Sequence, residues 1–225
     1  FWDNDKKPYD SDPRQNPFYP RHHGTTVFSV IANEAPETSI AIYRFPALNM
    51  CKFENIIEHI NNNFIKLVNI SMGSSQKSDW SCFRKAASKY KNIIFVVSAG
   101  NNGFDIDQNL IYPASFDLDN IITVTSSDQN GRLGRGSNFG KKSVDFMIPA
   151  ERVEVLDHRG IKTFTGGTSY AAPRMTAMIS RYLEKNPNKS VKDVINVLKK
   201  RSIKTNQKLT KYGWIPDPLD NYLFN

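Results

Sequence analysis

Short, almost uninterrupted runs of Val, Ile and other apolar residues recur along this chain and limit the folds open to it. Strands buried on both faces of a parallel sheet read in this way, whereas strands with one solvated face alternate between apolar and polar residues. We therefore expect buried strands at five places, namely residues 39–45, 67–72, 93–99, 121–127 and 144–150.

Apolar residues at helical spacing lie between or after these runs. The last such stripe begins after Ser190, which stands three positions before Asp193 as in a capping box. The four stripes are Phe53, Ile56, Ile57, Ile60 and Phe64; Trp80, Phe83, Ala87 and Tyr90; Met175, Met178, Ile179, Tyr182 and Leu183; and Val191, Val194, Ile195 and Leu198. Strands and helices that alternate over 39–99 predict an α/β fold with a mostly parallel central sheet flanked by helices. Such sheets place their sites at the carboxyl ends of the strands.

The length and composition are those of one globular domain. The chain has 225 residues, of which 39% are hydrophobic and 23% charged, and this excludes disordered and collagen-like classes. The apolar runs are far shorter than the roughly 18 residues of a membrane-spanning helix, so we expect no membrane span. Because no linker or repeat divides the chain, we expect a single domain over 1–225, with a loop over 1–22 and a mostly loop-like tail over 204–225.

A basic stretch and two cysteines bear on partners and compartment. Residues 174–211 hold 11 of the 30 Lys and Arg residues but two of the 22 Asp and Glu residues. A nucleic-acid-binding surface is one interpretation. No zinc-finger spacing or aromatic-rich basic strand accompanies the charge, so we prefer the solvated faces of two helices and expect no nucleic-acid partner. Cys51 and Cys82 are too few for a disulfide scaffold, and two buried, reduced thiols are expected, with one disulfide left open.

Three short polar segments stand out because each lies where a strand ends or a helix begins. His23 opens a helical pattern, where its ring can stay accessible and act as a general base. Asn101 follows the strand 93–99, where its amide can donate to a developing negative charge. Ser169 follows two glycines at the start of a helix, whose free N–H groups favour negative charge. Each also has a purely structural explanation: His23 as an exposed histidine, Asn101 as part of a turn, and Ser169 as an N-cap.

Taken together, these segments resemble the subtilases, the subtilisin-like serine proteases. Gly167-Thr168-Ser169-Tyr170-Ala171-Ala172-Pro173 fits the family signature Gly-Thr-Ser-x-Ala-x-Pro. His23 to Val27 fits His-Gly-Thr-x-Val, and Ala99-Gly100-Asn101 fits the Ala-Gly-Asn that supplies the oxyanion donor. The motifs occur in the family's order, and the looser match covers about residues 20–200. The resemblance implies a subtilisin-like three-layer sandwich.

The resemblance also implies a role for each residue. Ser169 is the expected nucleophile and His23 the expected general base. Asn101 and the backbone N–H of Ser169 are expected to hold the oxyanion. One wall of the specificity pocket, which also pairs with an extended substrate, is expected to be Ser71, Met72 and Gly73. The opposite wall is expected to be Ser98, Ala99 and Gly100. Residues around 103–115 are expected to form the pocket floor. No cofactor is implied.

One catalytic residue of the family has no counterpart. The family's Asp stands in Asp-(Ser/Thr)-Gly at the end of an apolar strand before the His, and this chain has no such motif. We therefore expect the Asp to come from outside this chain, either from a preceding segment or from a separate N-terminal fragment; loss of the Asp in this lineage is the alternative. The acids ahead of His23, none of which follows an apolar strand or precedes Gly, are Asp3, Asp5, Asp10 and Asp12.

Other departures from the family pattern are smaller. Phe28 and Ser29 replace the usual Ala-Gly, and Arg174 replaces a common His. The short connection over 32–39 leaves no room for a frequent calcium-binding insertion. Asp105 and Asp107 could touch a calcium ion, although a solvated loop is the simpler explanation.

Two functions are compatible with these observations. The first is a serine endopeptidase that acts on protein or peptide substrates and is inactive or weak as this chain alone. The alternative is a non-catalytic subtilase-like module that binds extended peptides or a partner protein. An extracellular or periplasmic compartment is suggested by the resemblance alone.

Overall fold

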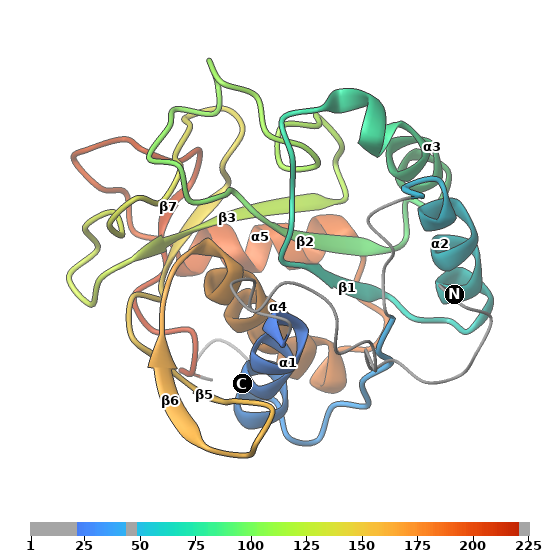
Figure 1. Ribbon diagram of the computed structural model, residues 1–225, viewed down its shortest axis with the longest axis horizontal. Coiled ribbons are helices and arrows are strands. Elements are labelled where there is room, and N and C mark those ends of the chain that lie inside the picture. Colours follow the sequence, from blue (N-terminus) through green and yellow to red (C-terminus); the bar gives the residue numbers. More distant parts are fainter. Residues whose placement is uncertain (1–21, 44–48, 221–225) are drawn as a thin grey trace.

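A parallel sheet in the strand order β1-β2-β3-β4-β7 forms the centre of the molecule (Figure 1). The computed structural model describes residues 22–43 and 49–220. Every pairing within this sheet is parallel, which confirms the predicted α/β class. The five strands are β1 (Leu67–Ile70), β2 (Ile94–Ser98), β3 (Ile121–Ser127), β4 (Phe146–Pro149) and β7 (Gly213–Trp214).

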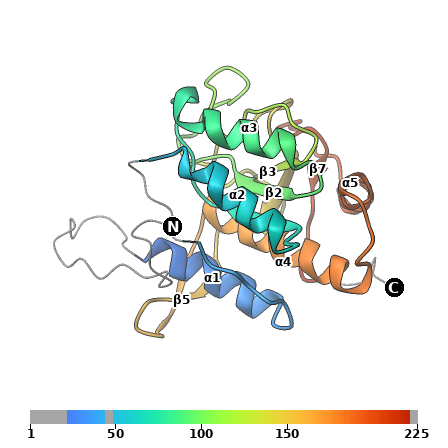
Figure 2. The same ribbon diagram turned by 90° about the vertical axis from the view of Figure 1, so that its right-hand side faces the viewer.

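Helices cover both faces of the sheet. In Figure 2, α2 and α3 lie on one side of the strands, whereas α4 and α1 lie on the other. The helices are α1 (His23–Glu34), α2 (Lys52–Asn62), the 3₁₀ helix η1 (Lys77–Trp80), α3 (Ser81–Lys89), α4 (Thr168–Lys185) and α5 (Val191–Arg201). None of the helices within the described ranges is both long and apolar enough to cross a bilayer.

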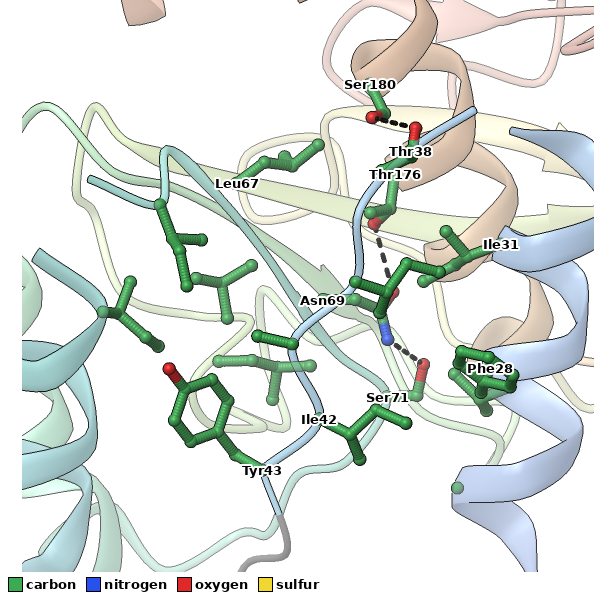
Figure 3. A pocket seen from close by; sticks show the side chains of 18 of the residues that line it. Phe28, Ile31, Thr38, Ile42, Tyr43, Leu67, Asn69, Ser71, Thr176 and Ser180 are labelled. Atoms are coloured by element: carbon green, nitrogen blue, oxygen red, sulfur yellow. Dashed lines mark hydrogen bonds between the residues drawn. The ribbon is translucent and has the colours of Figure 1, made fainter. Parts of the chain in front are cut away.

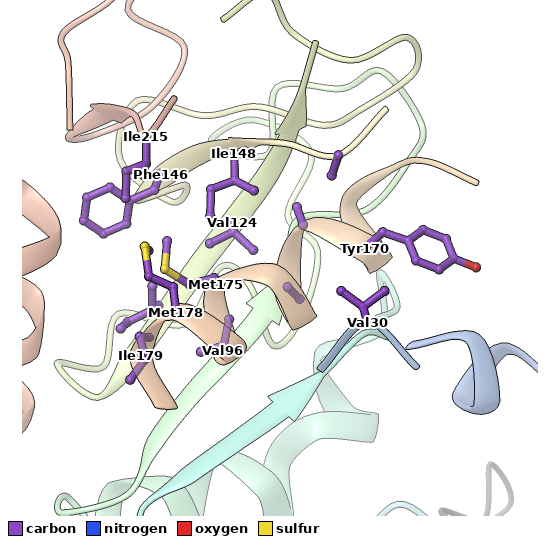
Figure 4. Packing of buried hydrophobic residues seen from close by; sticks show 14 of the residues in the cluster. Val30, Val96, Val124, Phe146, Ile148, Tyr170, Met175, Met178, Ile179 and Ile215 are labelled. Carbon is purple, nitrogen blue, oxygen red and sulfur yellow. The ribbon is translucent and has the colours of Figure 1, made fainter. Parts of the chain in front are cut away.

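Alternate residues of one strand supply the two halves of the core. Phe95 and Val97 of β2 pack with α2 and α3, while Ile94 and Val96 point to the opposite face. There they meet the apolar stripe of α4, whose Met175 and Met178 lie under the strands in Figure 4. Because every residue of β2 is buried, this strand carries a continuous apolar run, whereas β3 is equally buried but includes Thr and Ser residues.

Four of the five predicted strands are confirmed with small changes at their ends. The segment predicted as a strand over 39–45 is different: residues 39–43 belong to no strand, and 44 and 45 lie outside the described residues. A strand requires a paired neighbour, and none of the described residues pairs with this segment. Three strands were not predicted, namely the antiparallel pair β5 (Val153–Leu156) and β6 (Lys162–Thr165), and β7 within the supposedly loop-like tail.

The four apolar stripes are helical, with one error. Phe64 lies beyond the end of α2 with φ of 57° and is 88% exposed, so it does not belong to the core. The predicted capping box is confirmed, because Ser190 and Asp193 bond to each other's backbone N–H groups. Residues 1–21 of the loop predicted over 1–22, including the acids Asp3, Asp5, Asp10 and Asp12, lie outside the described residues.

The two cysteines are joined, which overturns the expectation of two buried, reduced thiols. Cys51 is exposed at the start of α2, and Cys82 is half-buried in the first turn of α3. Because the two helices pack side by side, the Cα atoms lie 5.0 Å apart and the sulfurs form a disulfide. A disulfide persists in oxidising compartments, which agrees with the compartment that the resemblance suggests.

Asp145, directly before β4, makes the stability of the fold depend on pH. Its buried carboxylate accepts the Thr123 N–H at 2.9 Å, and burial raises its pKa to about 6 although Lys211 and Lys199 oppose the shift. The native state therefore holds the proton more tightly than the unfolded chain, so the free energy of unfolding falls between about pH 4 and pH 6. Asp145→Asn keeps the acceptor and removes the charge, so it should be more stable than the parent above pH 6, by up to about 3 kcal/mol.

Urea unfolding of both proteins at pH 4, 6 and 8 measures this difference. Asp119→Asn, at an exposed position nearby, is the matched control and should follow the parent throughout. A constant difference between the Asp145→Asn variant and the parent from pH 4 to pH 8 would contradict the assignment.

Candidate active site

Ser169 lies in the first turn of α4, directly after two glycines that the backbone geometry requires. Gly167 has φ of 109°, a left-handed conformation that favours glycine, and a Cβ there would lie 3.0 Å from Oδ1 of Asn101. A Cβ on Gly166 would lie 2.5 Å from the carbonyl oxygen of Glu151. The backbone N–H of Ser169 makes no hydrogen bond within the described part of the chain. It is one of the free donors that every helix start presents.

A proline in α4 changes the hydrogen bonding of Ser169. Pro173 has no N–H, so it cannot donate to the carbonyl of the residue four positions earlier, which is Ser169. The hydroxyl of Ser71, just beyond the end of β1, donates to this carbonyl instead, at 2.8 Å. Ser71 in turn accepts from Asn69, which accepts from Thr176 of α4. This chain of polar contacts holds the start of α4 against the carboxyl end of β1.

Asn101 follows β2 and has its amide group oriented by one neighbour. Its Oδ1 accepts both the backbone N–H and the hydroxyl of Thr168, at 2.9 and 3.0 Å. The carbonyl end of the amide is therefore occupied, and the amide N–H₂ end is the one left for another acceptor. Since Thr168 immediately precedes Ser169, this amide and the free N–H of Ser169 belong to one small region. Two free donors near a serine hydroxyl are the groups that an oxyanion hole requires.

Asn138 supports this arrangement and was missed by the sequence analysis. It is fully buried, and its Nδ2 donates to the carbonyl of Ala99. Its Oδ1 accepts the N–H groups of Asn102 and Phe104. A buried side-chain amide that satisfies three loop groups fixes the loop that carries Asn101. Ser137-Asn138 resembles any polar turn, so the sequence carried no signal for this role.

His23 begins α1, as predicted, and its ring lies beside the residue that follows Ser169. The rings of His23 and Tyr170 meet edge to face with centroids 6.0 Å apart. The Tyr170 hydroxyl lies 3.0 Å from Oγ1 of Thr26, which donates to the His23 carbonyl. No hydrogen bond joins the His23 ring to Ser169 among the described residues. Burial lowers the pKa of His23, which favours the neutral imidazole that a general base requires.

No carboxylate of the described residues bonds to the His23 ring. Among the described residues, burial is the one influence on its pKa, whereas a neighbouring carboxylate would raise that pKa. Residues 22–43 and 49–220 therefore supply an imidazole, a serine hydroxyl and free N–H donors, but no carboxylate bonded to the imidazole.

The residues expected to form the specificity pocket meet in part. A cavity of about 410 Å³ contains Ser169 and Asn101 together with Met72, Gly73, Ser98 and Gly100. Ala99 is fully buried beneath the wall and supports it from the core, and Ser71 and His23 line a second cavity instead (Figure 3). From the stretch 103–115, Phe104 and Ile111 line the 410 Å³ cavity, and none of the described side chains that line it is charged.

Asp105 and Asp107 have partners that explain them without a metal. Both carboxylate oxygens of Asp107 accept backbone N–H groups, from Lys142 and Ser143, and Asp105 accepts the N–H of Asp107. Within the described ranges, no three His, Cys, Asp or Glu side chains gather as they would around a metal ion.

Three arginines of the basic stretch make ion pairs or hydrogen bonds within the protein. Arg174 pairs with the buried Glu34 at 2.7 Å and joins α4 to α1. Arg181 donates to the carbonyls of Glu34 and Pro218, and Arg201 donates to the carbonyl of Asp217. These side chains therefore tie helices and the C-terminal segment together, which accounts for part of the positive charge over 174–211.

Comparison with known proteins agrees with the motifs. A sequence profile of the subtilase family matches residues 1–214. The chain therefore belongs to the subtilase family of serine proteases.

Relatives and solved structures extend this result. Subtilisin-like protease 2 of Plasmodium falciparum is 27% identical over 92% of this chain, which spans 17% of that protein. Subtilisin DY of Bacillus licheniformis is 30% identical over 63% of the chain, which covers 51% of that protein. The structure of the subtilase cytotoxin SubAB superposes with a TM-score of 0.78 at 22% identity, covering 91% of this chain and 76% of the other. The Staphylococcus aureus epidermin leader peptide processing protease gives a TM-score of 0.76 at 23% identity, with 89% and 63% covered. These likenesses show the subtilisin-like fold.

Proposed function

We propose that this chain carries the nucleophile, base and oxyanion hole of a serine endopeptidase. The observation that carries the proposal is the orientation of Asn101. Because Thr168 occupies its Oδ1, the amide N–H₂ is presented beside the free N–H of Ser169. A purely structural turn has no need for two unpaired donors next to a serine hydroxyl at a helix start.

The proposed reaction needs protein groups alone and no cofactor. The neutral His23 takes the proton of the Ser169 hydroxyl while Oγ attacks the scissile carbonyl. Asn101 and the Ser169 N–H hold the resulting oxyanion. His23 gives the proton to the leaving amine, and an acyl-enzyme remains. Water, activated by the same imidazole, then attacks the ester, and the acid product and free Ser169 are regenerated.

An extended peptide is the substrate that the site supports. Residues 71–73 follow β1 and belong to no strand, so their backbone can pair with a peptide strand. The adjoining cavity of about 410 Å³ can take one side chain of that peptide. Its lining is uncharged, which disfavours burying a charged side chain there. The protease relatives are consistent with a peptide or protein substrate.

The acid of the triad, on this proposal, comes from outside the described residues. His23 requires a partner that fixes its tautomer and stabilises the imidazolium during attack. A preceding segment of the same polypeptide or a separate N-terminal fragment can supply it.

A non-catalytic peptide-binding module is the second candidate. One observation favours it, namely that His23 and Ser169 share no hydrogen bond. In free serine hydrolases this bond is often long and tightens when substrate binds, so the endopeptidase is the better account.

A fluorophosphonate probe tests the choice, because it reacts with an activated serine and not with an ordinary hydroxyl. Prolonged incubation of the 225-residue chain should add one label, which peptide mass spectrometry should place on Ser169. Ser169→Ala should remove the label, whereas Ser88→Ala on α3 should keep it. An unlabelled parent chain would favour the binding module, and a labelled Ser169→Ala variant would show that another residue reacts.

A further inference from the structure

A group of exposed lysines surrounds the beginnings of β4 and β7, and the proposed function makes no use of it. The lysines come from the loop before β4, from the last turn of α5 and from the loop between α5 and β7. All of their side chains are exposed. We refer to these residues as the lysine patch, namely Lys141, Lys142, Lys199, Lys200, Lys204, Lys208 and Lys211.

Contacts between the three segments bring the lysines onto one surface. The N–H of Gly140 donates to the carbonyl of Leu209 at 2.9 Å, which holds the loop after α5 against the loop before β4. The ammonium groups of Lys199 and Lys211 lie 4.3 and 5.3 Å from the centre of the Tyr212 ring. Because both contact the same ring, the last turn of α5 belongs to the same surface as the two loops.

The lysine patch carries far more positive than negative charge. None of its members makes an ion pair within the described part of the chain, whereas Lys85 and Lys162 elsewhere on the surface each pair with a glutamate. Asp117 and the buried Asp145 interact with Lys211, and they are the acids that act on it. The remaining charge of the patch is therefore open to an anion from outside the protein.

The helix dipole explains part of this charge. Cations are favourable in the last turn of a helix, and Lys199 and Lys200 occupy that turn of α5. The other members lie in loops, where no helix dipole stabilises them. The loop between α5 and β7 alone contributes Lys204, Lys208 and Lys211. Neither burial nor pairing accounts for these loop lysines, so a ligand is the better explanation.

We propose that the lysine patch binds a sulfated polysaccharide. Such a chain carries permanently charged sulfate groups at intervals. Lysine presents a compact ammonium group on a flexible stem, which can follow charges whose spacing the protein does not fix. Release of the counterions condensed on a polyanion favours binding. The disulfide between Cys51 and Cys82 agrees with an oxidising compartment such as the cell surface, where sulfated polysaccharides occur.

Two other polyanions fit the patch less well. Single-stranded nucleic acid binds through bases that stack on exposed aromatic rings. The ring of Tyr212 packs against Phe146 and is contacted by two ammonium groups, so it is not free for a base. Anionic lipids lie mainly on the cytoplasmic leaflet of a membrane, which faces a reducing compartment. The patch therefore favours a polysaccharide over both.

The lysine patch and the candidate active site lie at opposite ends of the sheet. All strands of the sheet are parallel. Lys142 and Lys211 come shortly before the first residues of β4 and β7. Ser71 and Asn101, by contrast, follow the last residues of β1 and β2. A polysaccharide on the patch would thus hold the protein in place and leave Ser169 accessible. This inference does not depend on the proposed function.

Heparin, a sulfated polysaccharide, tests the proposal on the full 225-residue chain. Calorimetric titration should show binding that weakens at least tenfold between about 50 and 200 mM NaCl. The patch variant carries four substitutions, which are Lys142→Gln, Lys200→Gln, Lys204→Gln and Lys208→Gln. It keeps Lys199 and Lys211, so Tyr212 retains both of its contacts. At equal salt it should bind heparin at least tenfold more weakly than the parent.

A control variant removes the same charge from exposed positions elsewhere. It carries Lys77→Gln, Lys85→Gln, Lys91→Gln and Lys162→Gln, and should bind heparin within twofold of the parent. Both variants have the same net charge, so equal weakening would mean a general effect of charge and would overturn the proposal. Tighter binding of a single-stranded oligonucleotide, or of vesicles of phosphatidylserine and phosphatidylcholine, would overturn the choice of polysaccharide. Far-UV circular dichroism checks that both variants fold.

Fluorophosphonate labelling tests the placement of the patch. The rate at which Ser169 is labelled should be the same with and without saturating heparin, because the two sites lie at opposite ends of the sheet. Labelling that heparin blocks would contradict this placement. A chain that is not labelled under either condition would count against the endopeptidase, while the heparin titrations would still decide the lysine patch.

Discussion

Peptide hydrolysis by this chain is expected to rise about 10⁴-fold when a carboxylate partner for His23 is supplied, the size known for removing the triad acid in a serine protease. The carboxylate beside His23 would hold the imidazole in the tautomer whose free nitrogen faces Ser169. It would also stabilise the imidazolium that forms as the serine proton moves. Burial alone lowers the pKa of His23, so the imidazolium is disfavoured at the moment when catalysis needs it.

A chromogenic peptide assay measures this effect by comparing the chain extended with an Asp-bearing preceding segment with the same extended chain in which that Asp is replaced by Asn. The Asn variant is the control, because it keeps the added segment and removes the charge. Robust hydrolysis by the isolated chain would instead mean that Asp3, Asp5, Asp10 or Asp12 reaches His23. Those residues lie outside the described part of the chain.

Replacing Asn101 by Ala is expected to lower kcat by about 10²–10³-fold, with little change in KM. The magnitude is that of the corresponding donor in subtilisin, a member of this family. The amide N–H₂, fixed by Thr168, is aimed at charge that exists in the transition state and not in the bound peptide. Losing it should therefore affect the chemical step more than substrate binding.

The assay for Asn101→Ala uses the chain extended with the Asp-bearing segment. Asn109→Ala, in the exposed loop that follows Asp107, serves as the control and should behave like the parent. Asn101→Asp should be at least as impaired as Asn101→Ala, because a carboxylate cannot donate and repels the oxyanion. A loss confined to KM would show that Asn101 binds substrate instead of the transition state.

The sequence predicted the centre of the sheet well and its edges poorly. The runs at 93–99 and 121–127 are buried on both faces, and their Ile and Val residues identify them. The segment 39–45 also contains several apolar residues, but pairing depends on a neighbour that no local pattern reveals. Strand β7 has two residues and forms because distant chain segments meet there. By contrast β5 was detectable, since its Val-Glu-Val-Leu alternates between buried and exposed residues.

The motifs located the site, but their geometry required the folded chain. Asn101 was identified from its place after a strand, whereas the orientation of its amide depends on Thr168, 67 positions away. The supporting role of Asn138 depends on loop carbonyls and N–H groups that no motif encodes. The disulfide was left open because helix packing decides whether two thiols meet. In each case the missing information was a long-range contact.

Ser71 links the two cavities, since it lines the one that includes His23 and its hydroxyl holds the carbonyl of Ser169, which lines the 410 Å³ cavity. A contact that fixes the main chain at the end of β1 therefore also fixes the position of the start of α4.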